Sequence, residues 1–281
     1  NRYTLARYNE DGSLDSSFGG GGTQSTNWGS VGSSLYSVDF QSDGKIIVGG
    51  SRYAGGCSPG IAETTVTRYT ANGHLDTSFG SSGEVRYNVP YGPHHDGGGP
   101  VVVDVDDSIY LGCHESYGSW AGVLRLSASG SVRGLHNVSG GTASGIAFND
   151  AGDLLISTNQ KIIRADTDIT LDTSFGDGGA ADLGGYTPVT HSWRTLILDE
   201  EGRILQAMRD ADDAFVLARY TTDGQLDTDF GAHGGFNRFV VDATHMWTGP
   251  IALQSDGAIL MTGTRQVSDG DRDWVVARVC P

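Results

Sequence analysis

Two short patterns alternate along this chain, and their repetition limits its fold more strongly than any other feature. The first is an apolar run with an Arg, then Leu-Asp, two further residues and Phe-Gly, at residues 2–19, 65–80, 162–176 and 216–231. The second is a two-residue turn, which is Asp-Gly, Asp-Asp, Ala-Gly or Glu-Gly, between two short apolar runs, at positions 43, 106, 151, 201 and 256. These turns lie 45 to 63 residues apart, which is close to the length of one β-propeller blade.

Each repeat predicts four strands, which we call A, B, C and D in chain order. The Asp-Gly turn joins A to B in a tight hairpin, and the alternating apolar run before Leu-Asp marks C. Glycine accounts for 43 of the 281 residues, which disfavours helices. We therefore predict an all-β fold, most simply a β-propeller of five four-stranded blades.

We expect a single domain over residues 1–281. Its repeat units cover about 28–90, 91–136, 137–186, 187–240 and 241–281, and residues 1–27 are expected to supply closing strands. Degenerate copies of the first pattern at 123–135 and 274–281 raise the number of C-type strands to six. The sixth C strand has no assigned place in a propeller with five A–B pairs.

The alternation of LARYNxDGxLDxxFGxxG with DGKIxxxG resembles the delta-60 repeat family of bacterial β-propellers. The resemblance covers nearly the whole chain, and it departs at 131–135, where SVRGL stands in place of LDTSFG. It implies a secreted bacterial protein with a propeller fold. It supplies no catalytic residues that could be carried over.

The residues copied into most repeats are interpreted as structural, because a functional site is rarely copied into every blade. Each repeated Arg is followed eight residues later by an Asp, and a charge-assisted hydrogen bond between them would hold the C–D connection. The pairs are Arg7–Asp15, Arg68–Asp76, Arg164–Asp172 and Arg219–Asp227. In Phe-Gly we expect an apolar plug between blades, followed by a glycine with an unusual backbone angle.

Charge and composition restrict the possible partners. The net charge is 18 − 34 = −16, which disfavours nucleic acid and anionic lipid as partners. No apolar run is long enough for membrane insertion. The acidic, lysine-poor, Gly/Ser/Thr-rich composition is typical of a secreted or periplasmic protein.

The candidate functional residues lie in the D–A and B–C loops, which vary between repeats and share one face of a propeller. Function usually resides in variable loops on a rigid scaffold. The D–A loops would surround the mouth of the central channel, and they contribute Trp28, His94, His95, Asp96, His191, Trp193, His245 and Trp247. The B–C side adds Tyr53, Tyr117 and Trp120.

Three functional interpretations of this face compete. Aromatic walls with a few polar groups suit a glycan or another extracellular ligand. Alternatively, His95, His191 and His245 converge on a transition metal, or His and Tyr act as base and acid in polysaccharide cleavage. Calcium in an Asp-rich loop is a further candidate, and no cofactor is firmly indicated.

The leading hypothesis is a lectin-like binding module that recognises a glycan or cell-surface ligand. The alternatives are a metal-dependent or His/Tyr polysaccharide-cleaving enzyme and a structural module of a larger extracellular protein. A purely structural role for the face also stays open. In that case the tryptophans cap the channel and the histidines bond to neighbouring blades.

Overall fold

The computed structural model confirms the predicted all-β class. It describes residues 2–28, 32–54, 61–89, 96–115, 120–138, 141–186, 195–210, 212, 214–240, 245–268 and 271–280. Within these ranges the chain forms 21 strands and no helix, so none of the described segments is a helix capable of crossing a membrane. Two compact units, Asn1–Ser139 and Gly140–Pro281, are considered separately.

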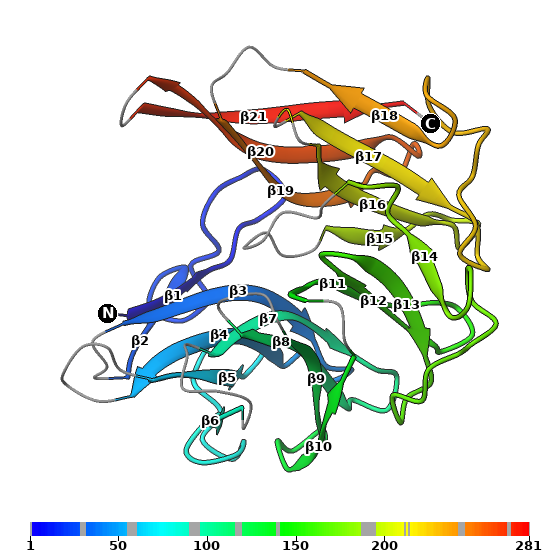
Figure 1. Ribbon diagram of the computed structural model, residues 1–281. Helices are drawn as coiled ribbons and strands as arrows, with labels where there is room; N and C mark the ends of the chain where they lie inside the picture. The colour runs from blue at the N-terminus through cyan, green and yellow to red at the C-terminus, as the bar shows by residue number, and fades with distance from the viewer. Residues whose placement is uncertain are drawn as a thin grey trace. The chain divides into compact units, whose positions relative to one another are not determined.

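Unit 1 contains a strand pair and two blades (Figure 1). The pair is β1 (Arg2–Ala6) and β2 (Thr23–Asn27). The first blade consists of β3 (Ser33–Phe40), β4 (Ile46–Ala54), β5 (Ile61–Tyr69) and β6 (Glu84–Tyr87). The second consists of β7 (Asp96–Val103), β8 (Ile109–Glu115), β9 (Ala121–Leu126) and β10 (Val132–Asn137).

Unit 2 contains three blades. The first consists of β11 (Ala143–Phe148), β12 (Leu154–Thr158), β13 (Lys161–Ala165) and β14 (Ala180–Asp182). The second consists of β15 (Leu196–Leu198), β16 (Ile204–Arg209), β17 (Phe215–Tyr220) and β18 (Phe236–Phe239). The third consists of β19 (His245–Leu253), β20 (Ile259–Ser268) and β21 (Asp271–Val279).

The predicted propeller repeat is confirmed, because each expected repeat unit holds one antiparallel sheet with strands in chain order. Four of these sheets have the expected four strands, and the described part of the last has three. Strand β21 pairs with β20 and is the C strand of the last blade, so the predicted surplus C strand is β1. Strand β1 pairs with β2 in a separate two-stranded sheet. The single domain closed by residues 1–27 involves both units and stays a prediction.

The predicted Arg–Asp bonds are all present, at N–O distances of 2.8 Å for Arg7–Asp15, 2.9 Å for Arg68–Asp76, 2.6 Å for Arg164–Asp172 and 2.7 Å for Arg219–Asp227. Each guanidinium also lies over the Phe ring of its own repeat, with 4.5 to 4.9 Å between its carbon and the ring centre. In the degenerate repeat, Arg125 instead lies over Tyr110, at 5.6 Å. These repeated contacts among Arg, Asp and Phe hold the C–D turn.

The Phe-Gly pair connects successive blades. Phe18 and Phe175 are buried, and each packs on a turn glycine of the following repeat. A Cβ atom at Gly73 would lie 2.6 Å from the Phe18 ring, and one at Gly224 would lie 2.7 Å from the Phe175 ring. The glycines that follow the four Phe residues have φ between +52° and +72°, as predicted.

Candidate functional site

Five of the eleven predicted site residues fall outside the described part of the chain. These are His94, His95, Tyr117, His191 and Trp193. For three others only the backbone is described: Asp96 begins β7 opposite Glu115, and His245 and Trp247 lie on β19 opposite Gln266 and Thr264. The three-histidine metal site therefore stays a prediction. The described residues contain no group of three or more His, Cys, Asp or Glu arranged to hold a metal.

The remaining predicted residues, Trp28, Tyr53 and Trp120, are described in full. Trp28 follows β2 and is half-buried. Tyr53 lies near the end of β4 with 36% of its surface exposed, and its ring packs on Gly32, where a Cβ atom would lie 2.5 Å from it. Trp120 is 7% exposed and belongs to the hydrophobic core of the two unit 1 blades. It is therefore a packing residue with little surface for a ligand.

Arg52 contacts both an aromatic side chain and a buried carboxylate. Its Nη1 donates to Oε2 of Glu84 at 2.6 Å, and its Nη2 donates to the carbonyl of Trp28 at 2.9 Å. Its guanidinium carbon lies 5.5 Å from the centre of the Trp28 ring. We call Trp28, Arg52, Glu63, Glu84 and Arg86 the Arg52 site.

Strand register brings these charges together. On adjacent strands, Arg52 of β4 lies opposite Glu63 of β5, and Arg86 and Glu84 of β6 lie opposite Thr65 and Thr67 of β5. Because side chains alternate between the two faces of a sheet, the four charged residues share one face. Arg86 Nε donates to Glu63 at 2.7 Å, so the face carries two ion pairs.

The same face packs against the β1–β2 pair. The Tyr3 hydroxyl donates to the Ser51 carbonyl at 2.9 Å and lies 3.3 Å from Oγ1 of Thr65. Tyr69 donates to Thr26 of β2 at 2.9 Å. Burial raises the pKa of Tyr3 to about 12, so its hydroxyl stays protonated at neutral pH.

Glu84 is 3% exposed, and this burial raises the pKa of its carboxyl even though Arg52 and Arg86 act in the opposite direction. Removal of a charge from water disfavours its ionised form. Glu63 is more accessible and is paired with Arg86. The two glutamates on this face therefore have different environments.

Three buried polar atoms of the site have no hydrogen-bond partner in the described part of the chain: Trp28 Nε1, Arg52 Nε and Glu84 Oε1. A buried polar atom without a partner costs about 1–3 kcal/mol. Such a set is uncommon in a protein core and distinguishes the Arg52 site from its surroundings.

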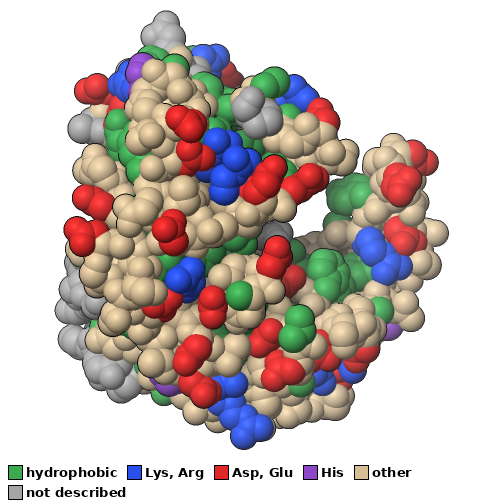
Figure 2. Space-filling view, turned by 90° about the vertical axis from the view of Figure 1, so that its right-hand side faces the viewer, with side chains coloured by type: hydrophobic (Ala, Val, Ile, Leu, Met, Phe, Trp, Pro, Cys, Tyr) green, Lys and Arg blue, Asp and Glu red, His purple; other side chains and the backbone are tan. Residues whose placement is uncertain are grey.

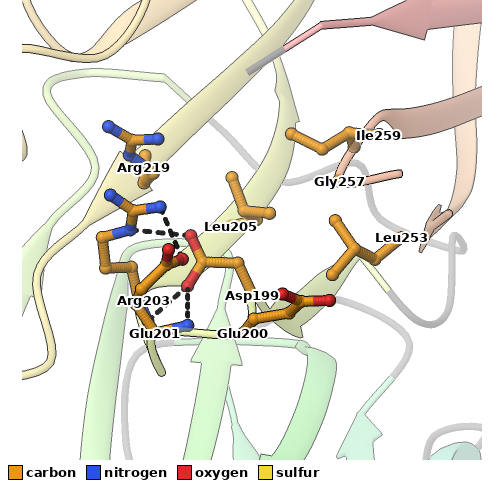
Figure 3. A pocket seen from close by; sticks show the side chains of 9 residues that line it. All are labelled: Asp199, Glu200, Glu201, Arg203, Leu205, Arg219, Leu253, Gly257 and Ile259. Atoms are coloured by element: carbon orange, nitrogen blue, oxygen red, sulfur yellow. Dashed lines mark hydrogen bonds and ion pairs between the residues drawn. The ribbon is translucent and has the colours of Figure 1, made fainter. Parts of the chain in front are cut away.

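A second candidate lies in unit 2, on the side of the A–B and C–D turns. The Arg219 pocket has a volume of about 150 Å³ and is drawn in Figure 3. It is lined by Asp199, Glu200, Glu201, Arg203, Leu205, Arg219, Leu253, Gly257 and Ile259. A wider hollow of about 350 Å³ lies nearby, lined by acidic residues such as Asp150 and Asp223 together with Arg164. Figure 2 likewise shows Asp and Glu side chains scattered over the surface that it presents.

Sequence reasoning finds part of the Arg52 site. Arg52 is predictable, because it ends strand B beside a variable loop, and Trp28 lies in a D–A loop. Glu84 is not predictable, because it lies in a fourth strand that carries no repeated pattern. It is 32 residues from Arg52 in the chain, and only the strand register brings the two together.

Comparison with known proteins supports the fold and leaves function open. The family described as "Domain of unknown function (DUF5122) beta-propeller" matches residues 1–18, 41–79 and 210–230. No curated protein matches.

Among solved structures, a protein of unknown function from Bacteroides caccae is 13% identical, with a TM-score of 0.50, and 85% of this chain matches 73% of that one. A putative exo-β-1,3-galactanase from Bifidobacterium bifidum is 11% identical, with a TM-score of 0.46, 98% of this chain matching 91% of that one. The first likeness concerns the fold alone, and the second carries no argument about activity.

Proposed function

We propose that the protein is a secreted binding module that recognises a glycan at the Arg52 site. The observation that carries this proposal is the stacking of Trp28 on Arg52, whose guanidinium is held by the buried Glu84. Secretion itself rests on the acidic, lysine-poor composition.

The chemistry of a sugar suits these groups. A pyranose ring has apolar C–H faces that pack on aromatic rings, and its hydroxyls donate and accept hydrogen bonds. Trp28 supplies the aromatic surface and Arg52 supplies a fixed donor group, while Glu84 holds the guanidinium in place. Binding sites with mostly apolar walls and a few oriented polar groups have this composition.

The geometry favours binding over polysaccharide cleavage. Glycosidases use two carboxyl groups that reach the scissile bond. Glu63 and Glu84 share a face, but Glu84 is 3% exposed and is bonded to Arg52. A general acid must come within hydrogen-bond distance of the leaving oxygen, and Glu84 does not have that access.

The proposal is tested by a glycan array with wild-type protein and a Trp28→Ala variant. We expect this variant to lose at least about tenfold in apparent affinity for the bound glycans. Trp274→Ala is the matched control, because Trp274 is 85% exposed on β21 of unit 2. Near-UV circular dichroism checks that each variant is folded.

Two results would oppose the proposal. Unchanged glycan binding by the folded Trp28→Ala variant would place the site elsewhere, and equal losses in Trp28→Ala and in Trp274→Ala would indicate a nonspecific effect. Loss of binding in Trp193→Ala, with Trp28→Ala unaffected, would instead support the loops that carry His191 and Trp193.

A further inference from the structure

A side-chain amide joins the two blades of unit 1 on the side of the A–B turns. Gln41 follows β3 and is buried. Its Nε2 donates to the backbone carbonyls of Asp107 at 3.1 Å and Ala128 at 3.0 Å. Its Oε1 accepts from Nη1 of Arg68 at 3.2 Å. Asp107 lies in the A–B turn of the second blade and Ala128 follows its C strand, so the amide lies between the two blades.

The matching residue in unit 2 is one methylene shorter and is bonded within its own turn. Asn149 follows β11 as Gln41 follows β3. Its Nδ2 donates to Oδ2 of Asp153 at 3.1 Å, and its Oδ1 accepts from the backbone N–H of Asp153 at 2.8 Å. Among the described residues, the Asn149 side chain therefore forms no bridge to the following blade.

A hollow of about 350 Å³ lies beside Asn149, and we call it the Asn149 hollow. Its lining includes Gly202 and Thr222, which correspond in the repeat to the two residues whose carbonyls bind Gln41. The lining also includes Arg164, whose Nη1 donates to the Thr222 carbonyl at 2.9 Å. The hollow thus keeps the partners of the side-chain amide of unit 1 without a side chain that bridges them.

The Thr222 carbonyl can accept a second hydrogen bond beside the one from Arg164. A carbonyl oxygen has two lone pairs. In unit 1 the carbonyl of Ala128 uses both, because it accepts from Arg68 at 2.6 Å and from Gln41 at 3.0 Å. A donor group in the Asn149 hollow would therefore complete the arrangement that unit 1 completes with its own side chain.

The charge of the lining selects a cation. Four carboxylates border the hollow: Asp150, Asp153, Glu201 and Asp223. Arg164 supplies the guanidinium of the lining, and it is already paired with Asp172 at 2.6 Å. A surface with this excess of carboxylates attracts cations and repels anions.

The shape and the ligand geometry favour an extended organic cation over a metal ion. The described residues contain no group of three or more His, Cys, Asp or Glu arranged to hold a metal, whereas calcium takes six to eight oxygen ligands. A volume of 350 Å³ equals about twelve water molecules at roughly 30 Å³ each. The hollow is therefore large enough for a short aliphatic chain with a charged group at each end.

We infer that the Asn149 hollow binds a small linear polyamine. One primary ammonium group, which has three donors and no acceptor, donates to the carbonyls of Gly202 and Thr222. A second ammonium group lies among the exposed carboxylates of Asp150 and Asp223. This site is in unit 2 and does not depend on glycan recognition at the Arg52 site.

The test is an NMR titration of the ¹⁵N-labelled intact protein with 1,4-diaminobutane at constant ionic strength. We expect saturable shifts of the backbone N–H signals of Gly202 and Asp223. Butanamide, a neutral amide of similar length, and Mg²⁺ are each expected to bind at least about tenfold more weakly. Absence of a saturable shift with the diamine, or equal binding of butanamide or Mg²⁺, would overturn the proposal.

Two substitutions separate the position of the site from its charge. Asn149→Gln leaves the charge unchanged and restores the bridging side chain of unit 1, so we expect at least about a tenfold loss of diamine affinity. Asp150→Asn should weaken binding at least about threefold, whereas its control Glu10→Gln, on an exposed residue of unit 1, should change it less than about twofold. Unchanged affinity in the folded Asn149→Gln variant, or equal losses in Asp150→Asn and Glu10→Gln, would overturn the proposal.

Discussion

The packing of Phe18 on Gly73 predicts that two glycines at equivalent turn positions respond very differently to the same substitution. Gly12 and Gly73 close the same turn in successive repeats, with φ of +81° and +84°. A Cβ atom at Gly12 would meet no atom within 4 Å, whereas one at Gly73 would lie 2.6 Å from the Phe18 ring. The pair therefore separates the cost of the backbone angle from the cost of blade-to-blade packing.

The expected magnitudes follow from these two terms. An L residue in the left-handed region costs about 1–2 kcal/mol, and the reduced freedom of the unfolded chain returns about 0.4–1 kcal/mol. Gly12→Ala should therefore destabilise unit 1 by about 1 kcal/mol. Phe18 is 1% exposed and lies under Arg7, so its ring cannot move freely. Gly73→Ala should cost about 1–3 kcal/mol more through overpacking.

The assay is hydrogen exchange of the buried β5 amides across a urea titration, which reports the unfolding of unit 1. Phe18→Leu removes the ring atoms that the new Cβ would meet. In that background the costs of Gly12→Ala and Gly73→Ala should converge, because the two sites then differ little. Equal costs in the wild-type background, within about 0.5 kcal/mol, would refute the packing argument.

Other predictions concern the charged groups. Arg68→Met should destabilise unit 1 by about 3–5 kcal/mol in urea unfolding, because Arg68 is buried with Asp76 and also bonds to Ala128; Arg7→Met, on the more exposed pair, should cost clearly less, and the reverse order would contradict the structure. Burial raises the pKa of Glu84, so the stability that its carboxyl contributes is fully present below about pH 4.5 and is lost as the pH rises through the pKa of the folded state. Glu84→Gln should remove this pH dependence from the urea midpoints. An unchanged pH dependence would count against burial as its cause. Ser174 and Arg164 lower the pKa of Asp172 to about 2, so its contribution is present above pH 3.8 and is lost as the pH falls toward 2; Asp172→Asn should flatten the acid limb of unit 2, and a limb as steep as in wild type would oppose this assignment.

The parts of the fold that repeated local sequence patterns specify were predictable. The eight-residue spacing from Arg68 to Asp76 and the glycine after each Phe specify turns that form within one repeat. The contact of Phe18 with Gly73 was not predictable, because it joins turns of different repeats. The last blade also differs, since the described chain gives it three strands, and no repeated pattern marks D strands.

The candidate site was predictable only in part, for a physical reason. Aromatic residues in variable loops can be recognised from their positions, as Trp28 shows. Its charged partners come from the register of β4, β5 and β6, which one sequence does not reveal.

The most direct test of glycan recognition at the Arg52 site is an NMR titration of the tryptophan indole N–H signals with a glycan identified on the array. The Trp28 indole nitrogen has no hydrogen-bond partner among the described residues, and Trp28→Phe identifies its signal. Glycan recognition at the Arg52 site predicts a saturable shift of that signal, and Glu84→Gln should raise the dissociation constant at least about tenfold. A glycan that shifts other indole signals and leaves Trp28 unchanged would contradict the account.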